Sequence, residues 1–208
     1  MVAVVWRCVA MAASTLPLAH PAPQAAPSVG SAIAEREVRR TAARYDDTFR
    51  KYTKRYFGVG FDWRLFKAQG LAESNLDSAA LSWAGARGIM QLMPRTFREI
   101  ASRNPEMLHI DDPEWNIAAG IYYDRLLWRL WERDSVDRHR REFMLASYNA
   151  GRATILRAQA LARQDALDHR TWPAIERVAP KVDRWRYSET LGYVRRIDSL
   201  HAALMRRR

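Results

Sequence analysis

The stretch from Ala72 to Pro94 reads AESNLDSAALSWAGARGIMQLMP. Before it, residues 63–75 carry apolar side chains at helical spacing, and Asp62 is placed to cap the start of that helix. Gly85 and Gly88 then mark a tight loop, because glycine adopts backbone shapes that other residues resist. We therefore expect Glu73 to emerge near the C-terminal end of a helix, beside an apolar face and a glycine-containing loop.

This position favours a protonated carboxyl at Glu73. Burial and the negative end of the helix dipole both disfavour the charged form. A protonated glutamate can serve as the general acid in the cleavage of a glycosidic bond, where the leaving oxygen needs a proton. The side chains expected to form the apolar walls are Trp63, Phe66, Leu71, Met90 and Met93.

The pattern places no second carboxylate well. Asp77 falls beyond the expected helix end, and Asp111 and Asp112 have the pattern of helix caps. With one carboxylate, the sugar must supply the other reacting group, as in substrate-assisted glycosidases. Its N-acetyl oxygen can stabilise the cation and its 6-hydroxyl can attack, which gives a 1,6-anhydro product. A hydrolase would instead need a carboxylate that activates water, and Asp77 and Asp111 are the nominees.

Helical periodicity runs through most of the remaining chain. Apolar residues recur at steps of three and four, which indicates one buried face per helix. We expect helices over residues 32–57, 63–75, 112–131, 143–149, 152–167 and 189–205, and a short helix that begins at Pro94. A loop is expected around Pro173 and Pro180. No alternating strand pattern of useful length occurs. The sequence therefore predicts an all-α fold, with at most a very small hairpin between Asp77 and Gln91.

Composition limits the partners and the cofactors. The net charge of +11 favours polyanions, and nucleic acid, anionic lipid and the acidic bacterial cell wall all qualify. The basic residues are spread over many segments without a recognition-helix pattern, which argues against a nucleic-acid partner. The single cysteine forms no internal disulfide, and the five scattered histidines form no metal site, so we expect neither metal nor cofactor.

Several short blocks occur in order along the chain: Glu73-Ser74, Ser82, Gly85-Ala86-Arg87-Gly88, Met90-Gln91-Leu92-Met93-Pro94, Asn116-Ile117 with Gly120 and Tyr123, Ala146-Ser147-Tyr148-Asn149-Ala150-Gly151, and Glu189-Thr190 with Tyr193-Val194. In content and order these blocks resemble those of the soluble lytic transglycosylase and goose-type lysozyme group. The later half most resembles the catalytic domain of membrane-bound lytic transglycosylase F. One departure is the segment Leu76–Ala80, which lacks the Asn-Pro that often follows the catalytic Glu-Ser.

The resemblance implies a lysozyme-like helical domain over residues 58–208. Residues 28–57 would form an N-terminal amphipathic helix, and residues 1–27 an export signal with a Pro/Ala linker. The apolar part of that signal is too short to span a membrane as a stable helix.

The resemblance also implies roles for individual residues. Glu73 would be the sole general acid and base. The residues expected to bind or position the substrate are Ser82, Gln91, Met93, Tyr148, Asn149 and Tyr193. Tyr148 would form a hydrogen bond near Glu73, and Tyr193 would close the site from the last helix. Ser74 would be structural, because serine at a helix end often bonds the backbone.

The implied function is cleavage of the MurNAc–GlcNAc bond of peptidoglycan with formation of 1,6-anhydroMurNAc ends. The implied setting is the periplasm or envelope of a bacterium, with the protein a monomer that acts on glycan strands and has possible envelope or secretion-machinery partners. A hydrolytic goose-type lysozyme and a non-catalytic peptidoglycan-binding module are the alternatives. The sequence leaves open endo- or exo-action, peptide-stem preference and biological role.

Overall fold

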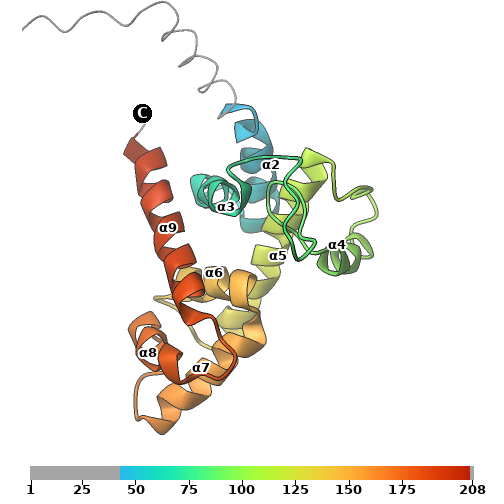
Figure 1. Cartoon of the computed structure of the whole chain (residues 1–208). Helices are drawn as coiled ribbons and strands as arrows, with labels where there is room; N and C mark the ends of the chain where they lie inside the picture. Colours follow the sequence, from blue (N-terminus) through green and yellow to red (C-terminus); the bar gives the residue numbers. More distant parts are fainter. Residues whose placement is uncertain (1–42, 207–208) are drawn as a thin grey trace, which may run out of the picture. The chain divides into compact units, whose positions relative to one another are not determined.

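A computed structural model describes residues 43–206, in which every regular element is a helix (Figure 1). The export signal, the linker and the beginning of the expected 28–57 helix lie outside the described residues. The elements are α2 (Asp46–Phe57), α3 (Arg64–Ser74), α4 (Pro94–Ala101), α5 (Pro113–Arg133), α6 (Arg140–Ala150), α7 (Arg152–Gln164), α8 (Trp172–Val178), the 3-10 helix η1 (Ala179–Lys181) and α9 (Tyr187–Arg206). The predicted all-α class is confirmed for this part of the chain.

Two local expectations need correction. The expected loop around Pro173 and Pro180 contains α8 and η1, because proline is tolerated in the first turn of a helix, where its missing N–H has no intrahelical partner. The possible hairpin is reduced to isolated antiparallel bridges that pair Arg87 with Leu81 and with Leu92. No strand forms within residues 43–206.

Helix α3 ends where the sequence predicts. Asn75 takes a left-handed conformation with φ 56°, and the N–H of Leu76 donates to the carbonyl of Gly70, which closes the last turn. At the other end the helix begins at Arg64, whose backbone N–H donates to the Asp62 carboxylate at 3.1 Å. Asp62 therefore supports the helix start, although Trp63 occupies the capping position.

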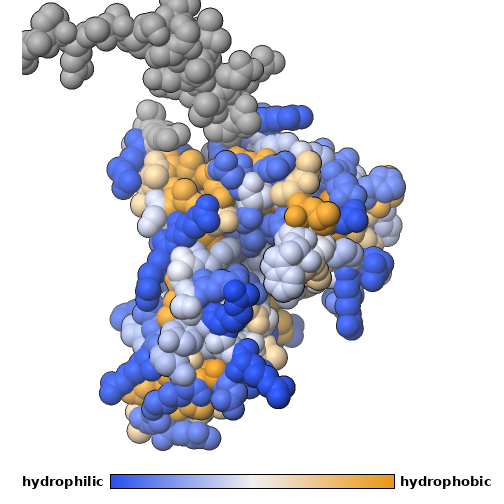
Figure 2. Space-filling model, viewed as in Figure 1, coloured by the Kyte–Doolittle hydropathy of each residue, from blue (hydrophilic) through white to orange (hydrophobic). Residues whose placement is uncertain are grey.

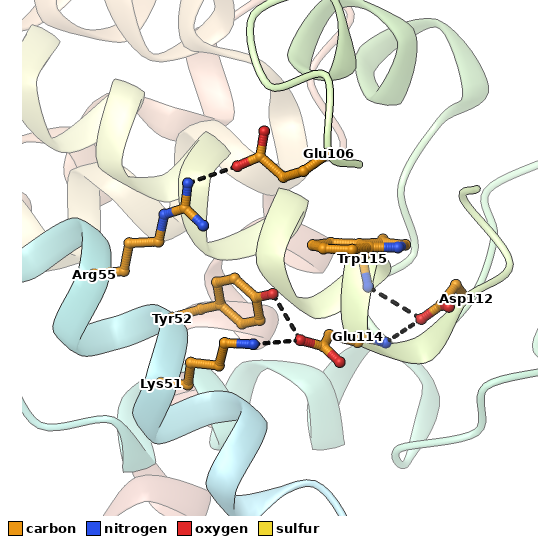
Figure 3. A network of polar contacts seen from close by, with 7 residues as sticks. All are labelled: Lys51, Tyr52, Arg55, Glu106, Asp112, Glu114 and Trp115. Atoms are coloured by element: carbon orange, nitrogen blue, oxygen red, sulfur yellow. Dashed lines mark hydrogen bonds and ion pairs between the residues drawn. The ribbon is translucent and has the colours of Figure 1, made fainter. Parts of the chain in front are cut away.

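The N-terminus of α5 is fixed from two sides, as Figure 3 shows. Asp112 accepts hydrogen bonds from the backbone N–H groups of Glu114 and Trp115, so it is the helix cap that the sequence predicted. The Glu114 carboxylate in turn accepts from Tyr52 at 2.8 Å and pairs with Lys51 at 2.6 Å, both on α2. This network attaches α2 to α5, along which it packs.

The loop between α3 and α4 is held against α5 by Asn116. Its Oδ1 accepts from the N–H of Met90 at 2.8 Å, and its Nδ2 donates to the carbonyls of Arg87 and Ile110. Gly88, with φ 73°, lies so close that a Cβ atom there would stand 2.5 Å from the Asn116 amide. These contacts therefore hold the loop tightly against the start of α5.

Helix α9 packs along α3 and against α6 (Figure 1). Its buried positions include Leu191, Val194 and Ile197, while Leu200 and Leu204 are partly buried. Among the helices of residues 43–206, none is long and apolar enough to cross a membrane. The contact between α3 and α9 joins the first half of the sequence to the last helix, and it positions the site described next.

Candidate active site

Glu73 and Tyr193 meet where α3 and α9 pack together. Glu73 is the second-last residue of α3, and Tyr193 lies near the start of α9. The Tyr193 hydroxyl donates to Glu73 Oε1 at 2.6 Å, although the two residues stand 120 positions apart. The sequence placed these two residues at opposite sides of one site, and the structure brings them into direct contact.

The environment of Glu73 brings the pKa of its carboxyl close to neutral pH. Burial raises the pKa of its carboxyl from 4.5 to about 7, against the lowering effects of the Tyr193 hydrogen bond and the positive charge of Arg196. A carboxyl with this pKa can donate a proton and take one back at neutral pH. Glu73 therefore has the acid–base property that cleavage of a glycosidic bond requires.

A hollow of about 360 Å³ opens beside Glu73. Its lining comes from the end of α3, the end of α6 and the first half of α9: Ala72, Glu73, Asn149, Glu189, Gly192, Tyr193 and Arg196. Asn149 and Glu189 also line a neighbouring hollow of about 260 Å³. The two hollows therefore meet at these residues. Figure 2 shows the surface hollowed beside α9 and edged largely by hydrophilic side chains.

The apolar side chains expected around Glu73 do not line the hollow beside it. Phe66 and Met90 are fully buried in the core, while Trp63 and Leu71 line a separate hollow between α3 and the end of α9. The walls beside Glu73 are instead a mixture of small, aromatic and charged residues.

Asn149 is held in place by a chain of hydrogen bonds. Trp185 Nε1 donates to Thr190 Oγ1 at 3.0 Å, and the Thr190 hydroxyl donates to Asn149 Oδ1 at 2.8 Å. The amide oxygen of Asn149 is therefore engaged, while its Nδ2 has no partner among residues 43–206. An exposed, oriented amide donor in the lining is suited to a carbonyl or hydroxyl of a sugar.

Tyr148 lies near Glu73 without bonding to it. Its hydroxyl donates to the carbonyl of Met90 at 2.8 Å, and its ring packs against Tyr123 with centroids 5.4 Å apart. Burial, and next the negative charge of Glu73, raise the pKa of the Tyr148 hydroxyl well above its ordinary value. Tyr148 thus connects α6 to the loop before α4, and its expected contact with substrate stays a prediction.

Ser82, Gln91 and Met93 lie in the loop between α3 and α4 and do not line the hollow beside Glu73. The Ser82 hydroxyl accepts from the N–H of Ala86 at 2.9 Å, and Gln91 Nε2 donates to the carbonyl of Gly88 at 3.0 Å. Met93 is 43% exposed just before α4. Their observed contacts shape and stabilise the loop, and their contribution to a sugar-binding surface stays a prediction. Ser74 bonds the backbone as expected, donating to the carbonyl of Ile89 at 2.9 Å.

The structure shows two carboxyls near Glu73 that sequence reasoning missed. Glu189 lines the same hollow, and Asp124 is fully buried on α5, within electrostatic range of Glu73. Asp77 and Asp111, the carboxylates that the sequence nominated, have other contacts: Asp77 accepts from the N–H of Ala79, and Asp111 pairs with Arg87. The spacing on α9 could have identified Glu189, because it precedes Tyr193 by one helical turn.

The comparisons with known proteins agree on one family. The family model described as "Transglycosylase SLT domain" matches residues 47–170. Among curated proteins, membrane-bound lytic murein transglycosylase F 1 of Alkalilimnicola ehrlichii is 35% identical over 83% of this chain and 34% of its own length. Membrane-bound lytic murein transglycosylase F of Shewanella pealeana is 32% identical over 76% of this chain and 31% of its own length. The chain spans about a third of the length of these relatives.

Solved structures share the fold. The 70 kDa soluble lytic transglycosylase of Escherichia coli superimposes with a TM-score of 0.58 at 25% identity, over 86% of this chain and 28% of that one. The lytic transglycosylase Slt of Pseudomonas aeruginosa, solved as an inactive mutant, gives a TM-score of 0.60 at 23% identity, over 78% of this chain and 24% of that one. The matched part of each is a minor share of a longer chain.

Proposed function

This chain belongs to the transglycosylase SLT family, and from that membership and the geometry of the site we propose that it is a peptidoglycan lytic transglycosylase. It would cleave the β-1,4 bond between MurNAc and GlcNAc and leave 1,6-anhydroMurNAc ends. The observation that carries the proposal is Glu73 in a hollow, with a pKa of about 7 and a hydrogen bond from Tyr193.

The first step uses Glu73 in its protonated form. Glu73 gives its proton to the glycosidic oxygen, and the bond from C1 of MurNAc to that oxygen breaks. The N-acetyl oxygen of the substrate stabilises the cation at C1. Glu73 is now a carboxylate, and the Tyr193 hydroxyl and the Arg196 charge both favour that form.

The second step uses Glu73 as a base. The 6-hydroxyl of the same sugar attacks C1 and its proton passes to the Glu73 carboxylate. The carboxyl is then protonated again, the anhydro ring is closed and no water is consumed. A pKa near neutrality suits both steps, because one group must give a proton and take one in the same cycle.

Charge around the hollows fits a cell-wall polymer. Arg196 lines the first hollow, and Arg184 and Arg186 line the second. Positive side chains along a groove attract a polymer whose peptide stems and sugars carry carboxylates. The relatives' names place them at membranes and on murein, which supports an envelope location for this protein. Its export, its monomeric state and any secretion-machinery partner stay predictions.

A digest of purified peptidoglycan tests the function. The protein would be compared with Glu73→Gln and Glu189→Gln, and the products would be identified by mass spectrometry. Anhydro-muropeptides from the wild type and from Glu189→Gln, with none from Glu73→Gln, would support the proposal. Reducing-end products that disappear with Glu189→Gln would show a hydrolase in which Glu189 activates water. Intact glycan with every variant would leave a binding module.

A further inference from the structure

We propose that Asp124 is a positioning residue of this site. Its carboxyl carries a proton and forms a ring of two hydrogen bonds with the side-chain amide of Gln69. This ring fixes the buried side of the site next to Glu73 and keeps that side uncharged. The assignment of a role in turnover rests on the proposed function, while the protonated ring itself does not. Nothing in the family motifs or the relatives' names points to either residue.

Two buried side chains from different helices face each other here. Gln69 on α3 and Asp124 on α5 are both fully buried, with no exposed surface. Gln69 Nε2 donates to Asp124 Oδ1 at 3.5 Å. The two remaining oxygens, Gln69 Oε1 and Asp124 Oδ2, are buried without any hydrogen-bond partner in the described part of the chain. An unpaired buried acceptor is unfavourable, and the pair contains two of them.

One proton resolves both unsatisfied atoms. A hydrogen on Asp124 Oδ2 can be donated to Gln69 Oε1, parallel to the existing contact from Nε2 to Oδ1. The planar carboxylic acid and the planar amide would then share a closed ring in which both of these oxygens have a partner. An ionised Asp124 has no hydrogen to donate, so both oxygens would stay unpaired.

The surroundings also favour the neutral acid. The titratable groups that face Asp124 are Glu73 from α3, Tyr123 from α5, Tyr148 from α6 and Tyr193 from α9, with Arg196 at the rim beside Glu73. Burial, and then the charge of Glu73, raise the pKa of Asp124 well above its ordinary value, and only the Gln69 bond opposes them. A buried charge without a counter-charge is strongly disfavoured.

The ring bears on Glu73 by position and by charge. Gln69 stands one helical turn before Glu73 on α3, so the two side chains lie on the same face. Bonding Gln69 to α5 therefore holds the last turn of α3, which carries Glu73. A negative charge at Asp124 would oppose the carboxylate that Glu73 becomes in the first step, and a neutral acid avoids this repulsion.

Infrared difference spectroscopy tests the proton directly and needs no activity. Asp124→Asn is the matched variant, because its amide can make the same two bonds to Gln69. On the proposal, the spectrum of wild type minus Asp124→Asn at neutral pH contains the C=O band of one protonated carboxylic acid. A carboxylate band in its place would overturn it. Gln69→Leu provides a second measurement: it keeps Asp124 and should move that C=O band to higher frequency, and an unmoved band would overturn the ring.

The pH–rate profile tests the positioning role. If Asp124 is already neutral, Asp124→Asn leaves the alkaline limb of activity at its wild-type pH, whereas loss of an ionised Asp124 would move that limb down by about one unit. Asp124→Leu and Gln69→Leu should both lower turnover, and Asp124→Asn should recover it. Gln159→Leu is the control, since Gln159 is also buried and donates to a backbone carbonyl away from the site. Equal turnover in Gln69→Leu and Gln159→Leu would reduce the pair to a structural contact. Absence of transglycosylase activity in the wild type would refute the proposed function and leave the infrared result standing.

Discussion

Tyr193→Phe removes one oxygen atom and, with it, the 2.6 Å hydrogen bond to Glu73. That bond lowers the pKa of Glu73, because it stabilises the ionised carboxylate. Its loss therefore raises the pKa above about 7. Glu73 must be protonated to start the reaction, so activity falls as pH rises through this pKa. We expect the alkaline limb of the pH–rate profile to move to higher pH in the variant.

The size of the shift follows from the strength of the bond. A hydrogen bond to a charged group contributes about 1.5–3 kcal/mol, and one pKa unit corresponds to about 1.36 kcal/mol. The hollow beside Glu73 is open to water, which can replace part of the lost bond, so the lower end applies and the limb should move by about one unit. At acid pH the variant should turn over about threefold to tenfold more slowly, because Glu73 is partly ionised in the transition state and loses part of that stabilisation.

The measurement is the initial rate of solubilisation of purified peptidoglycan at low substrate, which reports the free enzyme, over a range of pH. Tyr52→Phe is the matched control, since Tyr52 makes a 2.8 Å bond to the Glu114 carboxylate far along the chain from Glu73 (Figure 3). Tyr52→Phe should lower stability and leave the profile in place. An alkaline limb that stays fixed or moves to lower pH in Tyr193→Phe would refute this account of Glu73.

Three further changes test the site and its support. Glu73→Gln should abolish activity yet stabilise the protein above pH 7 by up to about 3 kcal/mol. The wild-type protein loses this stability as pH rises from the unfolded-state pKa near 4.5 through the folded-state pKa of about 7, because burial disfavours the charged carboxylate. Melting curves of both proteins at pH 4 and pH 8 check the sign, with no difference expected at pH 4. Gly120→Ala should destabilise by about 1–3 kcal/mol, since its Cβ would stand 2.7 Å from the Met90 side chain, and a denaturant titration measures this. Asn116→Ala removes three hydrogen bonds and should cost about 2–4 kcal/mol with loss of activity, which unfolding and digestion assays on the same preparation would show.

Local chemistry made much of the fold predictable. The end of α3 at Asn75 and the cap at Asp112 depend on a few neighbouring residues, and the structure bears them out. The short helix α8 lies in a region where the prolines at 173 and 180 favour a loop in the sequence. Proline in a first turn is compatible with a helix, and sequence alone does not say which use applies.

The site was less predictable because its contacts are long-range. Tyr148 and Tyr193 are both tyrosines in family motifs, yet only Tyr193 donates to Glu73, while Tyr148 donates to a backbone carbonyl. The choice depends on how α9 crosses α3, which no local pattern fixes. The same holds for Asp124, which resembles an ordinary surface acid of a long helix until packing places it opposite Gln69.

Different helices around Glu73 contribute separate effects on the pKa of its carboxyl. A group that acts first as acid and then as base needs a pKa near the working pH, and for Glu73 the effect of burial outweighs two smaller opposing influences. Burial raises the pKa, Tyr193 and Arg196 lower it, and Asp124, if neutral, adds no charge to either side. These groups come from different elements: α3 provides the Glu73 carboxyl, α9 provides Tyr193 and Arg196, which stabilise its charge, and α5 provides Asp124. The long separation of these elements in sequence is therefore what allows their effects on one carboxyl to be set independently.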